Sequence, residues 1–437
     1  MAGVFSRRRL MAAGAALMGA PAIVRAARPV EADVVVIGAG AAGLAAARAL
    51  RAGGRRVVVL EARNRIGGRA HTDTAALGLP FDRGAHWLHS ASVNPFLAEA
   101  RRLGRRTWLS GEDGLTLLRG GRALKDGEAQ LEAAMAQLER RVVRRSLLGA
   151  DFALGQAAGD EMQQVAAEYA AFTLATDRDR LSVQDYGALA DGEDHVVEGG
   201  FGQLVADLAA DVPVRTGHGV QKIDWRASDR VRVSGAFGAL DARQVVITVP
   251  PPVLARGTIA FDPPLPVLRQ AALDALQGGA FIKVGLRLDR PLTEAPEFAF
   301  DMDAALRHET TALYVDPRLP LATVIFSGRH ARALSTAGPG ALTAAGRAAL
   351  VAMLGSSLRG RITATTVADW TSDPFALGAY SVVKVGQARA RQVYGTPIDH
   401  RLFFAGDSDG KAYAVTVMGA RRSGEAAGRA ILARARG

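Results

Sequence analysis

Three glycines and one acidic residue near the start of the chain have the types and the spacing of a dinucleotide-binding motif. Gly38, Gly40 and Gly43 stand in the pattern G-x-G-x-x-G, and Glu61 follows about 20 residues later, where the motif carries its acid. Gly38 allows a tight turn, Gly40 lets the backbone approach a pyrophosphate, and Gly43 lets a helix pack closely on a strand. The spacing therefore predicts a dinucleotide site with Glu61 on the ribose. The alternative is a chance glycine-rich turn in a chain with 49 glycines.

The elements around the glycines are those that such a site needs. Residues 34–37 form a continuous apolar run, which is typical of a strand buried on both faces of a parallel sheet. Residues 41–52 are rich in alanine and predict a helix, whose free N–H groups and positive dipole end would face the phosphates. Residues 57–60 predict a second buried strand that ends at Glu61. This order of strand, turn, helix, strand and acid favours the dinucleotide site over a chance turn.

A second glycine pair follows the acid and favours FAD over NAD. The run Arg65-Ile66-Gly67-Gly68-Arg69 predicts a second close approach of backbone to the same cofactor, with Arg69 facing phosphate or flavin. The alternative is an ordinary glycine turn with a solvated arginine.

Residues 33–69 resemble the amino-terminal signature of the flavin-containing amine oxidases. This family includes monoamine oxidases, polyamine oxidases, histone demethylases of the same fold and L-amino-acid oxidases. The resemblance covers nearly all of residues 31–437, through motifs at five separated places in the family's order. It implies an α/β fold, in which a Rossmann-like FAD-binding domain is interleaved with an α+β substrate domain of mixed sheet and helices. The expected division assigns 1–27 to a Tat-type signal peptide, 31–90, 195–260 and 365–437 to the FAD-binding domain, and 91–194 and 261–364 to the substrate domain.

The second signature is the run from Asp82 to His89, with the sequence DRGAHWLH. It resembles the loop that lies against the flavin ring in the polyamine oxidase branch, which is the branch closest in motifs. The resemblance implies that Gly84 and Ala85 touch the flavin and that His89 contacts substrate. A structural role for His86 and His89 is the alternative. The spacing of these two histidines also matches a metal pair, but no third ligand of a suitable type lies nearby, so no metal site is expected.

Four further residues complete the expected catalytic centre. Lys283 is the one charge in an apolar run, and the resemblance implies that it holds a water against flavin N5; the alternative is a strand lysine on a solvated face. Tyr380 matches an aromatic residue that lines the cage before the flavin ring. Thr416 stands where monoamine oxidases carry a second tyrosine, which favours a polyamine substrate. Ala379 stands where covalent members carry cysteine, and the chain has no cysteine, so FAD is expected to be non-covalent.

The remaining cofactor contacts are also implied by the resemblance. Backbone groups near Val220 would hold the adenine, Asp407 would meet ribityl or pyrophosphate, although the family more often has Glu there, and the helix that starts near Thr416 would face the flavin O2 edge. The expected catalytic residues are Lys283, Tyr380, His89 and Thr416. The expected FAD-binding residues are Gly38, Gly40, Ala42, Gly43, Glu61, Ala62, Arg63, Gly68, Arg69, Gly84, Ala85, His86, Trp87, Val220, Trp370, Gly406, Asp407, Thr416 and Val417.

Residues 90–186 lack an alternating strand–helix rhythm and predict a mostly helical part of the substrate domain, with a hairpin over 115–119 and 122–124 and helices over 129–148 and 160–175. Later apolar runs predict further elements: strands over 212–215, 219–225, 245–249, 280–286, 310–315 and 322–327, and a helix over 342–358.

Composition and the amino terminus bear on location and partners. The chain has 437 residues and a formal net charge of +11, but its arginines are scattered rather than clustered with aromatics, so nucleic-acid binding is not expected. The run Ser6-Arg7-Arg8-Arg9-Leu10-Met11 precedes a short apolar segment and small residues. This pattern predicts a Tat signal that is removed near residue 26 or 27, use of the Tat export machinery and a periplasmic or secreted location, without stable membrane insertion. The alternative is an uncleaved anchor or tail.

The expected reaction is FAD-dependent amine oxidation. The resemblance implies hydride transfer from the α-carbon to flavin N5, hydrolysis of the imine, and reoxidation of the flavin by O2 to give hydrogen peroxide. A polyamine is the favoured small-molecule substrate, although the positive net charge argues mildly against it. The alternatives are an L-amino-acid oxidase, which needs an arginine for the carboxylate, a periplasmic amine dehydrogenase that passes electrons to a redox carrier, and a flavin-holding protein without activity.

Overall fold

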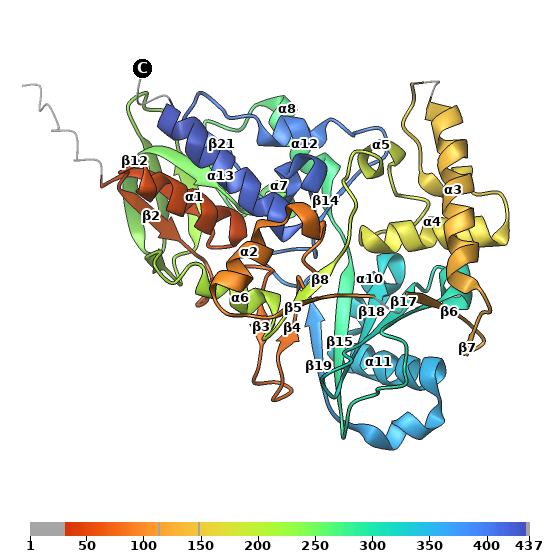
Figure 1. Cartoon of the computed structure of the whole chain (residues 1–437). Coiled ribbons are helices and arrows are strands. Elements are labelled where there is room, and N and C mark those ends of the chain that lie inside the picture. The colour runs from red at the N-terminus through yellow and green to blue at the C-terminus, as the bar shows by residue number, and fades with distance from the viewer. Residues whose placement is uncertain (1–30, 112–113, 147–148, 434–437) are drawn as a thin grey trace, which may run out of the picture.

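A computed structural model describes residues 31–111, 114–146 and 149–433 of the chain. The expected Tat signal over 1–27 lies outside the described residues. The molecule is built on two large sheets, each with helices on both faces (Figure 1).

The first sheet has eight strands and carries the predicted dinucleotide motif. Its centre is parallel, because β1 (Ala32–Ile37) pairs with β2 (Val57–Leu60) on one side and with β12 (Gly238–Ile247) on the other. The remaining strands are β9 (Val214–Arg215), β10 (Val220–Asp224), β11 (Val231–Gly235), β13 (Ala260–Asp262) and β21 (Leu402–Phe404). This sheet therefore joins segments that are far apart in the sequence, as the predicted interleaved fold requires.

The side chains of β1 alternate between two apolar cores, one on each face of the first sheet. Val34 and Val36 pack with α1 (Ala41–Ala52), α2 (Pro95–Arg102), α6 (Phe201–Asp207) and α13 (Val417–Ala433). Val35 and Ile37 pack with α7 (Pro251–Ala255), α8 (Val267–Ala275) and α12 (Ala390–Gly395). The continuous apolar run over 34–37 is explained by this burial on both faces.

The second sheet has seven strands and is mainly antiparallel. Its strands are, in spatial order, β19 (Ile362–Asp369), β15 (Phe281–Leu288), β18 (Leu321–Ser327), β17 (Thr311–Val315), β16 (Phe298–Asp301), β6 (Leu115–Arg119) and β7 (Arg122–Ala123). One face packs on α10 (Gly328–Ala337) and α11 (Pro339–Leu354). The other face packs on α3 (Gly127–Ser146), α4 (Glu161–Thr173) and α9 (Met302–Leu306). The predicted hairpin over 115–124 and the two predicted helices that follow it are confirmed.

Three two-stranded sheets of the described residues lie outside the two large sheets. They are β3 (Thr72–Asp73) with β4 (Phe81–Asp82), β5 (Thr107–Leu109) with β8 (His195–Val197), and β14 (Leu276–Gly278) with β20 (Ser381–Val383). The short helix α5 (Val183–Tyr186) follows the α4 region. Each of these strands has two or three residues, so the sequence carried no periodic signal for them.

Some predicted boundaries were wrong. The strand expected over 245–249 begins at Gly238, because the first half of β12 pairs with β11 while its second half pairs with β21. The strand expected over 212–215 is shorter, Val214–Arg215, and pairs with β2 at the edge of the sheet. The division into domains stays a prediction.

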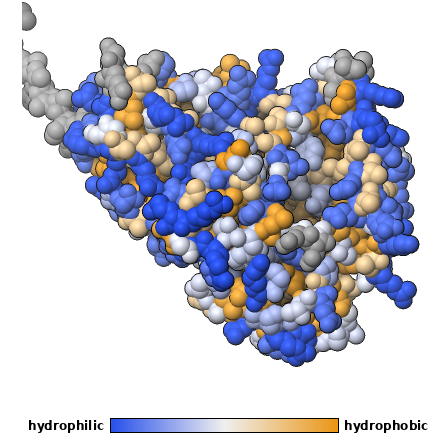
Figure 2. Space-filling model, in the orientation of Figure 1, coloured by the Kyte–Doolittle hydropathy of each residue, from blue (hydrophilic) through white to orange (hydrophobic). Residues whose placement is uncertain are grey.

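The face of the molecule in Figure 2 is largely hydrophilic, with apolar residues in separate groups. Val267 and Leu268, at the start of α8, are the most exposed large apolar residues described, at 81% and 76%. Within the described ranges, no helix is long and apolar enough to cross a bilayer.

Candidate active site

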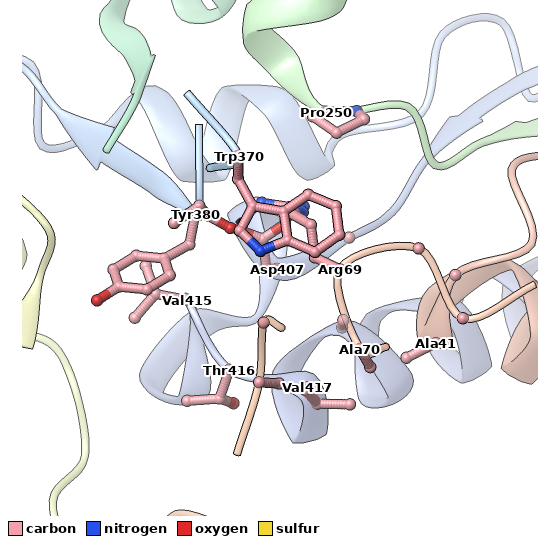
Figure 3. A pocket seen from close by; sticks show the side chains of 18 of the residues that line it. Ala41, Arg69, Ala70, Pro250, Trp370, Tyr380, Asp407, Val415, Thr416 and Val417 are labelled. Atoms are coloured by element: carbon pink, nitrogen blue, oxygen red, sulfur yellow. Dashed lines mark hydrogen bonds and ion pairs between the residues drawn. The ribbon is translucent and has the colours of Figure 1, made fainter. Parts of the chain in front are cut away.

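A cavity of about 780 Å³ contains nearly all the residues singled out in the sequence. Its walls come from the β1–α1 and β2 ends of the first sheet, from the loop after β4, from β15 of the second sheet and from the start of α13. Figure 3 shows Arg69, Trp370, Tyr380 and Asp407 among the side chains that line the cavity, with Thr416 and Val417 at the start of α13. Of the predicted catalytic and FAD-binding residues, only Gly43 does not line the cavity.

Gly43 instead sets the distance between α1 and β1. A Cβ atom at Gly43 would lie 1.9 Å from the carbonyl oxygen of Gly38, so only glycine permits this packing. Gly38 itself has φ of 103°, which other residues rarely adopt. The first glycine loop also touches the second, because a Cβ atom at Gly68 would lie 3.3 Å from the Cα of Gly40. Bare backbone on both loops fits close approach by a pyrophosphate.

Glu61, which the sequence predicts to bind ribose, is held by two backbone N–H groups. The Ala39 N–H donates to Glu61 Oε2 at 2.8 Å and the Arg63 N–H donates to Oε1 at 2.9 Å. The side chain is buried, yet it lines the cavity. Each oxygen keeps a further lone pair, so the carboxylate fits a pair of ribose hydroxyls. Val220 lines the same cavity, as the expected adenine contact requires.

Arg69 and Asp407 bind each other. Arg69 Nη2 lies 2.5 Å from Asp407 Oδ1, and Arg69 Nη1 donates to the Ala379 carbonyl at 2.8 Å. The Ser381 N–H donates to the second Asp407 oxygen at 3.3 Å. Both side chains line the cavity, so the expected contacts to phosphate, flavin or ribityl stay predictions, but the guanidinium and the carboxylate are oriented by the chain itself.

Lys283 is buried, which rules out the alternative of a lysine on a solvated face. Its Nζ donates to the carbonyl oxygens of Gly84 at 2.7 Å and Asp82 at 3.3 Å, and its side chain is 4% exposed. Burial lowers the pKa of the ammonium from 10.5 to about 8, and the Asp82 carboxylate opposes this shift. Lys283 on β15 thus holds the loop that carries Gly84 and Ala85 against the cavity.

The two histidines of this loop bind different carboxylates. His86 Nδ1 lies 2.9 Å from Asp82, whose buried carboxylate also accepts the backbone N–H groups of Phe201 and Gly202. His89 Nδ1 lies 2.8 Å from Asp194. Both histidines line the cavity. His86 is fixed in the loop by Asp82, whereas the imidazole of His89 remains half exposed.

Tyr380 and Thr416 are each held by a backbone carbonyl. The Tyr380 hydroxyl donates to the Thr173 carbonyl at 2.8 Å, and the tyrosine ring lies 6.0 Å from the ring of Phe281. Burial raises the pKa of the Tyr380 hydroxyl, so the group stays neutral. Thr416 Oγ1 donates to the Tyr413 carbonyl and accepts the Gly419 N–H at 2.9 Å. The Thr416 hydroxyl therefore caps the first turn of α13 as well as lining the cavity.

Several cavity residues were missed because they lie in segments without a motif. Asp194 and Glu128 bring two carboxylates to the cavity, and further walls come from Ser110, Tyr169, Phe172, Thr173, Phe281 and Phe298. The helical period over 160–175 predicted that the apolar residues of this segment lie on one face of a helix. It did not predict that this face lines a cavity.

A second titratable group of the described residues consists of Glu168, Asp177 and His308. Glu168 is paired with Arg178 at 3.1 Å, and Asp177 with Arg329 at 3.2 Å. Burial raises the pKa of Glu168. Since arginines already neutralise both carboxylates, the arrangement is a buried ion-pair network, and the prediction that the protein uses no metal stays a prediction.

Comparison with known proteins identifies the family. The model of the flavin containing amine oxidoreductases matches residues 41–148 and 166–432. Polyamine oxidase 3 of Oryza sativa subsp. japonica is 30% identical over 427 residues, which cover 90% of this chain and 87% of that protein. Lysine-specific histone demethylase 2 of Homo sapiens is 26% identical over 430 residues, which cover 90% of this chain and 52% of that protein; this chain thus spans about half of its length. A solved structure of a putrescine oxidase redesigned in cofactor binding shares the fold, with a TM-score of 0.78 at 22% identity over 92% of this chain and 99% of that chain. The chain belongs to the family of flavin containing amine oxidoreductases.

Proposed function

We propose that the protein is an FAD-dependent amine oxidase whose preferred substrate is a di- or polyamine. The bound flavin supplies a two-electron acceptor for the hydride of the carbon next to the amine nitrogen. The residues of the chain have to bind the amine, exclude water from it and orient that carbon toward the flavin. The observation that carries the proposal is a cavity with aromatic walls that also holds two carboxylates, Asp194 and Glu128, outside the predicted FAD-binding residues.

The aromatic walls suit a neutral amine at the reacting end. Tyr380 lies against Phe281, and Phe281 lies 5.2 Å from Phe172 between ring centroids. Tyr169 and Phe298 add to the same wall. Apolar surroundings disfavour the ammonium form, so they favour the neutral amine, whose lone pair assists C–H cleavage, and they restrict its orientation.

The carboxylates suit a second, charged nitrogen. Asp194 lines the cavity beside His89, and Glu128 lines it beside Leu115, whose N–H donates to Glu128 at 2.9 Å. An ammonium placed between such groups gains charge-assisted hydrogen bonds. The charge at Asp194 and Glu128 is therefore favourable for a polycation although the formal net charge of the chain is +11. The names of polyamine oxidase 3 and of putrescine oxidase agree with this substrate class.

The arginines argue against the amino-acid oxidase alternative. Among the described residues, three arginines line the cavity, and each is paired with a carboxylate of the chain: Arg63 with Asp373 at 2.6 Å, Arg69 with Asp407 at 2.5 Å, and Arg83 with Asp73 at 3.3 Å. A substrate carboxylate would have to compete with these pairs, while Asp194 and Glu128 would repel it.

The electron acceptor and the location form part of the proposal. Buried Lys283 places a positive charge beside Gly84, and a fixed cation there would stabilise the negative charge that forms as electrons pass to O2. O2 is thus the proposed acceptor, with hydrogen peroxide as product, and a periplasmic redox carrier is the alternative. The twin-arginine run supports export by the Tat route to the periplasm or beyond.

The test is anaerobic bleaching of the flavin by a panel of amines. Spermine, spermidine, putrescine, an aromatic monoamine and several L-amino acids would be compared in wild type, Asp194→Asn and Glu128→Gln. Polyamines are expected to bleach fastest, with KM raised about tenfold or more in the carboxylate variants and little change for the monoamine. Bleaching by amino acids alone would contradict the proposal. Bleaching without hydrogen peroxide in air would favour the dehydrogenase.

A further inference from the structure

A buried ion pair that does not reach the cavity is connected to it through a single serine. Arg391 on α12 binds Asp185 on α5 with two parallel hydrogen bonds, Nε to Oδ1 at 2.7 Å and Nη2 to Oδ2 at 2.8 Å. The arginine is 8% exposed and the aspartate 4%. Neither is among the described residues that line the cavity. We propose that Asp185 and Arg391 are positioning residues that hold Tyr380 and Asp407 in place at the flavin, an inference that rests on the proposed function for its kinetic part only.

Ser381 is the connecting residue. Arg391 donates from Nη1 to the Ser381 hydroxyl at 2.7 Å and from Nη2 to the Ser381 carbonyl at 3.2 Å. The N–H of the same serine donates to Asp407 at 3.3 Å. Asp407 in turn pairs with Arg69. A continuous series of buried polar contacts therefore runs from α5 to the cavity wall.

Tyr380 lies between two residues that this series fixes. On one side, the Ala379 carbonyl accepts from Arg69; on the other, Ser381 is held by Arg391. The Tyr380 hydroxyl is bound to the Thr173 carbonyl at the end of α4. The segment from α4 to α5 thus fixes the tyrosine at its hydroxyl directly, and at its backbone through Asp185 and Arg391.

The energetics favour a role in positioning over one in stability. A buried ion pair is roughly neutral for stability when compared with apolar residues of similar size, because desolvation offsets the attraction. What the pair supplies is a defined geometry, since all three guanidinium nitrogens of Arg391 and both oxygens of Asp185 are used. Asp151 provides an independent tie between the same segments, because it accepts both the Ser182 hydroxyl at 2.7 Å and the Gly386 N–H at 2.6 Å. Replacing the pair should therefore leave the fold intact.

The experiment replaces both charges together, as Asp185→Leu with Arg391→Met, so that no buried charge is left unpaired. Arg391→Lys is the second variant, which keeps the charge and loses the bidentate geometry. The control is Arg232→Met, which loses an ion pair to Asp241 in the first sheet. For the holoenzymes we would measure the visible circular dichroism of the flavin, the FAD dissociation constant, the melting temperature, and the rate of anaerobic flavin reduction by a polyamine.

We expect the double variant to bind FAD with an altered visible circular dichroism and to reduce it about 10- to 100-fold more slowly, because small misplacements of Tyr380 reduce the fraction of well-oriented complexes. Arg391→Lys should show a smaller change of the same kind, and Arg232→Met should change at most the melting temperature. In a Tyr380→Ala background, the Asp185 and Arg391 changes should slow reduction less than they do in the wild-type background, because the part of their effect that passes through Tyr380 is already lost.

Two results would overturn the inference: a lowered melting temperature with unchanged circular dichroism and unchanged reduction, or an undiminished loss of rate in the Tyr380→Ala background. If no amine reduces the wild-type flavin, the proposed function fails. The circular dichroism and the FAD dissociation constant then still decide the positioning role, since neither requires a substrate.

Discussion

Lys283→Met isolates the cost of a buried ammonium beside the proposed flavin site. Methionine has a similar length and no charge, so the change removes the ammonium with little change in packing. Burial lowers the pKa of Lys283 from 10.5 to about 8 in the folded protein. That shift corresponds to roughly 3 kcal/mol, because one pKa unit is equivalent to 1.36 kcal/mol.

The sign follows from proton binding. Between the folded and unfolded pKa values the unfolded chain holds the proton more tightly, so the unfolding free energy of the wild type rises with pH across this window. Below about pH 8 Lys283 is protonated in both the folded and the unfolded state, and the full free-energy cost of burying the ammonium is present. Above about pH 10.5 Lys283 is neutral in both states, and this cost is absent. The unfolding free energy of the wild type minus that of Lys283→Met should therefore increase by roughly 2–3 kcal/mol from about pH 7 to about pH 10.

The assay is urea denaturation across this pH range on protein from which FAD has been removed, so that cofactor release does not enter the equilibrium. Loss of the hydrogen bonds to Gly84 and Asp82 would offset the difference by a similar amount at every pH, so the slope is the informative quantity. Lys222→Met, which removes a half-exposed lysine paired with Asp262 at 2.8 Å, is the control and should change the difference with pH much less than Lys283→Met does. A flat difference for Lys283→Met would refute the reasoning, since it would mean that burial costs the Lys283 ammonium nothing.

Four other outcomes follow from the same structure. Lys283→Met should slow flavin reoxidation by O2 about tenfold or more while reduction changes little, and the wild-type reoxidation rate should fall as pH rises through about 8; stopped-flow traces with an unchanged oxidative half-reaction would count against its role. Gly43→Ala should lower the unfolding free energy by about 2 kcal/mol or more, because its Cβ would lie 1.9 Å from the Gly38 oxygen; urea denaturation equal to wild type would show that α1 shifts freely. Acid denaturation should release all the FAD into the supernatant, and flavin that stays on the chain would contradict non-covalent binding. Replacement of Arg7 and Arg8 by lysine should retain precursor in the cytoplasm, whereas normal export in a cell fractionation would show that the Tat signal is misread.

The glycine-rich part of the cavity could be predicted from the sequence because its requirements are local. Three local features each require a particular residue type at a fixed position: a turn with positive φ, a helix packed closely on a strand, and an acid at the end of a strand. Gly38, Gly43 and Glu61 occupy these three positions in the structure, as the spacing predicted. Lys283 was readable for a related reason, since one charge in an apolar strand needs buried partners. Its partners could not be predicted, because they are two backbone carbonyls, which every residue carries.

The rest of the cavity depended on contacts between distant segments. Asp194 pairs with His89 across 105 residues, and Arg69 pairs with Asp407 across 338. In the sequence, Glu128 looks like an ordinary acidic residue at the start of a helix, and Ser381 looks like an ordinary residue of a strand. The packing of the two sheets and their helices decides which carboxylates line the cavity and which arginines are already paired. Side chains that meet only through this packing have no fixed spacing in the sequence, so the sequence does not reveal them. The amino-acid sequence by itself determined the fold class and the glycine-rich motif beside the cavity, and the tertiary structure decided which charges and aromatic rings line that cavity.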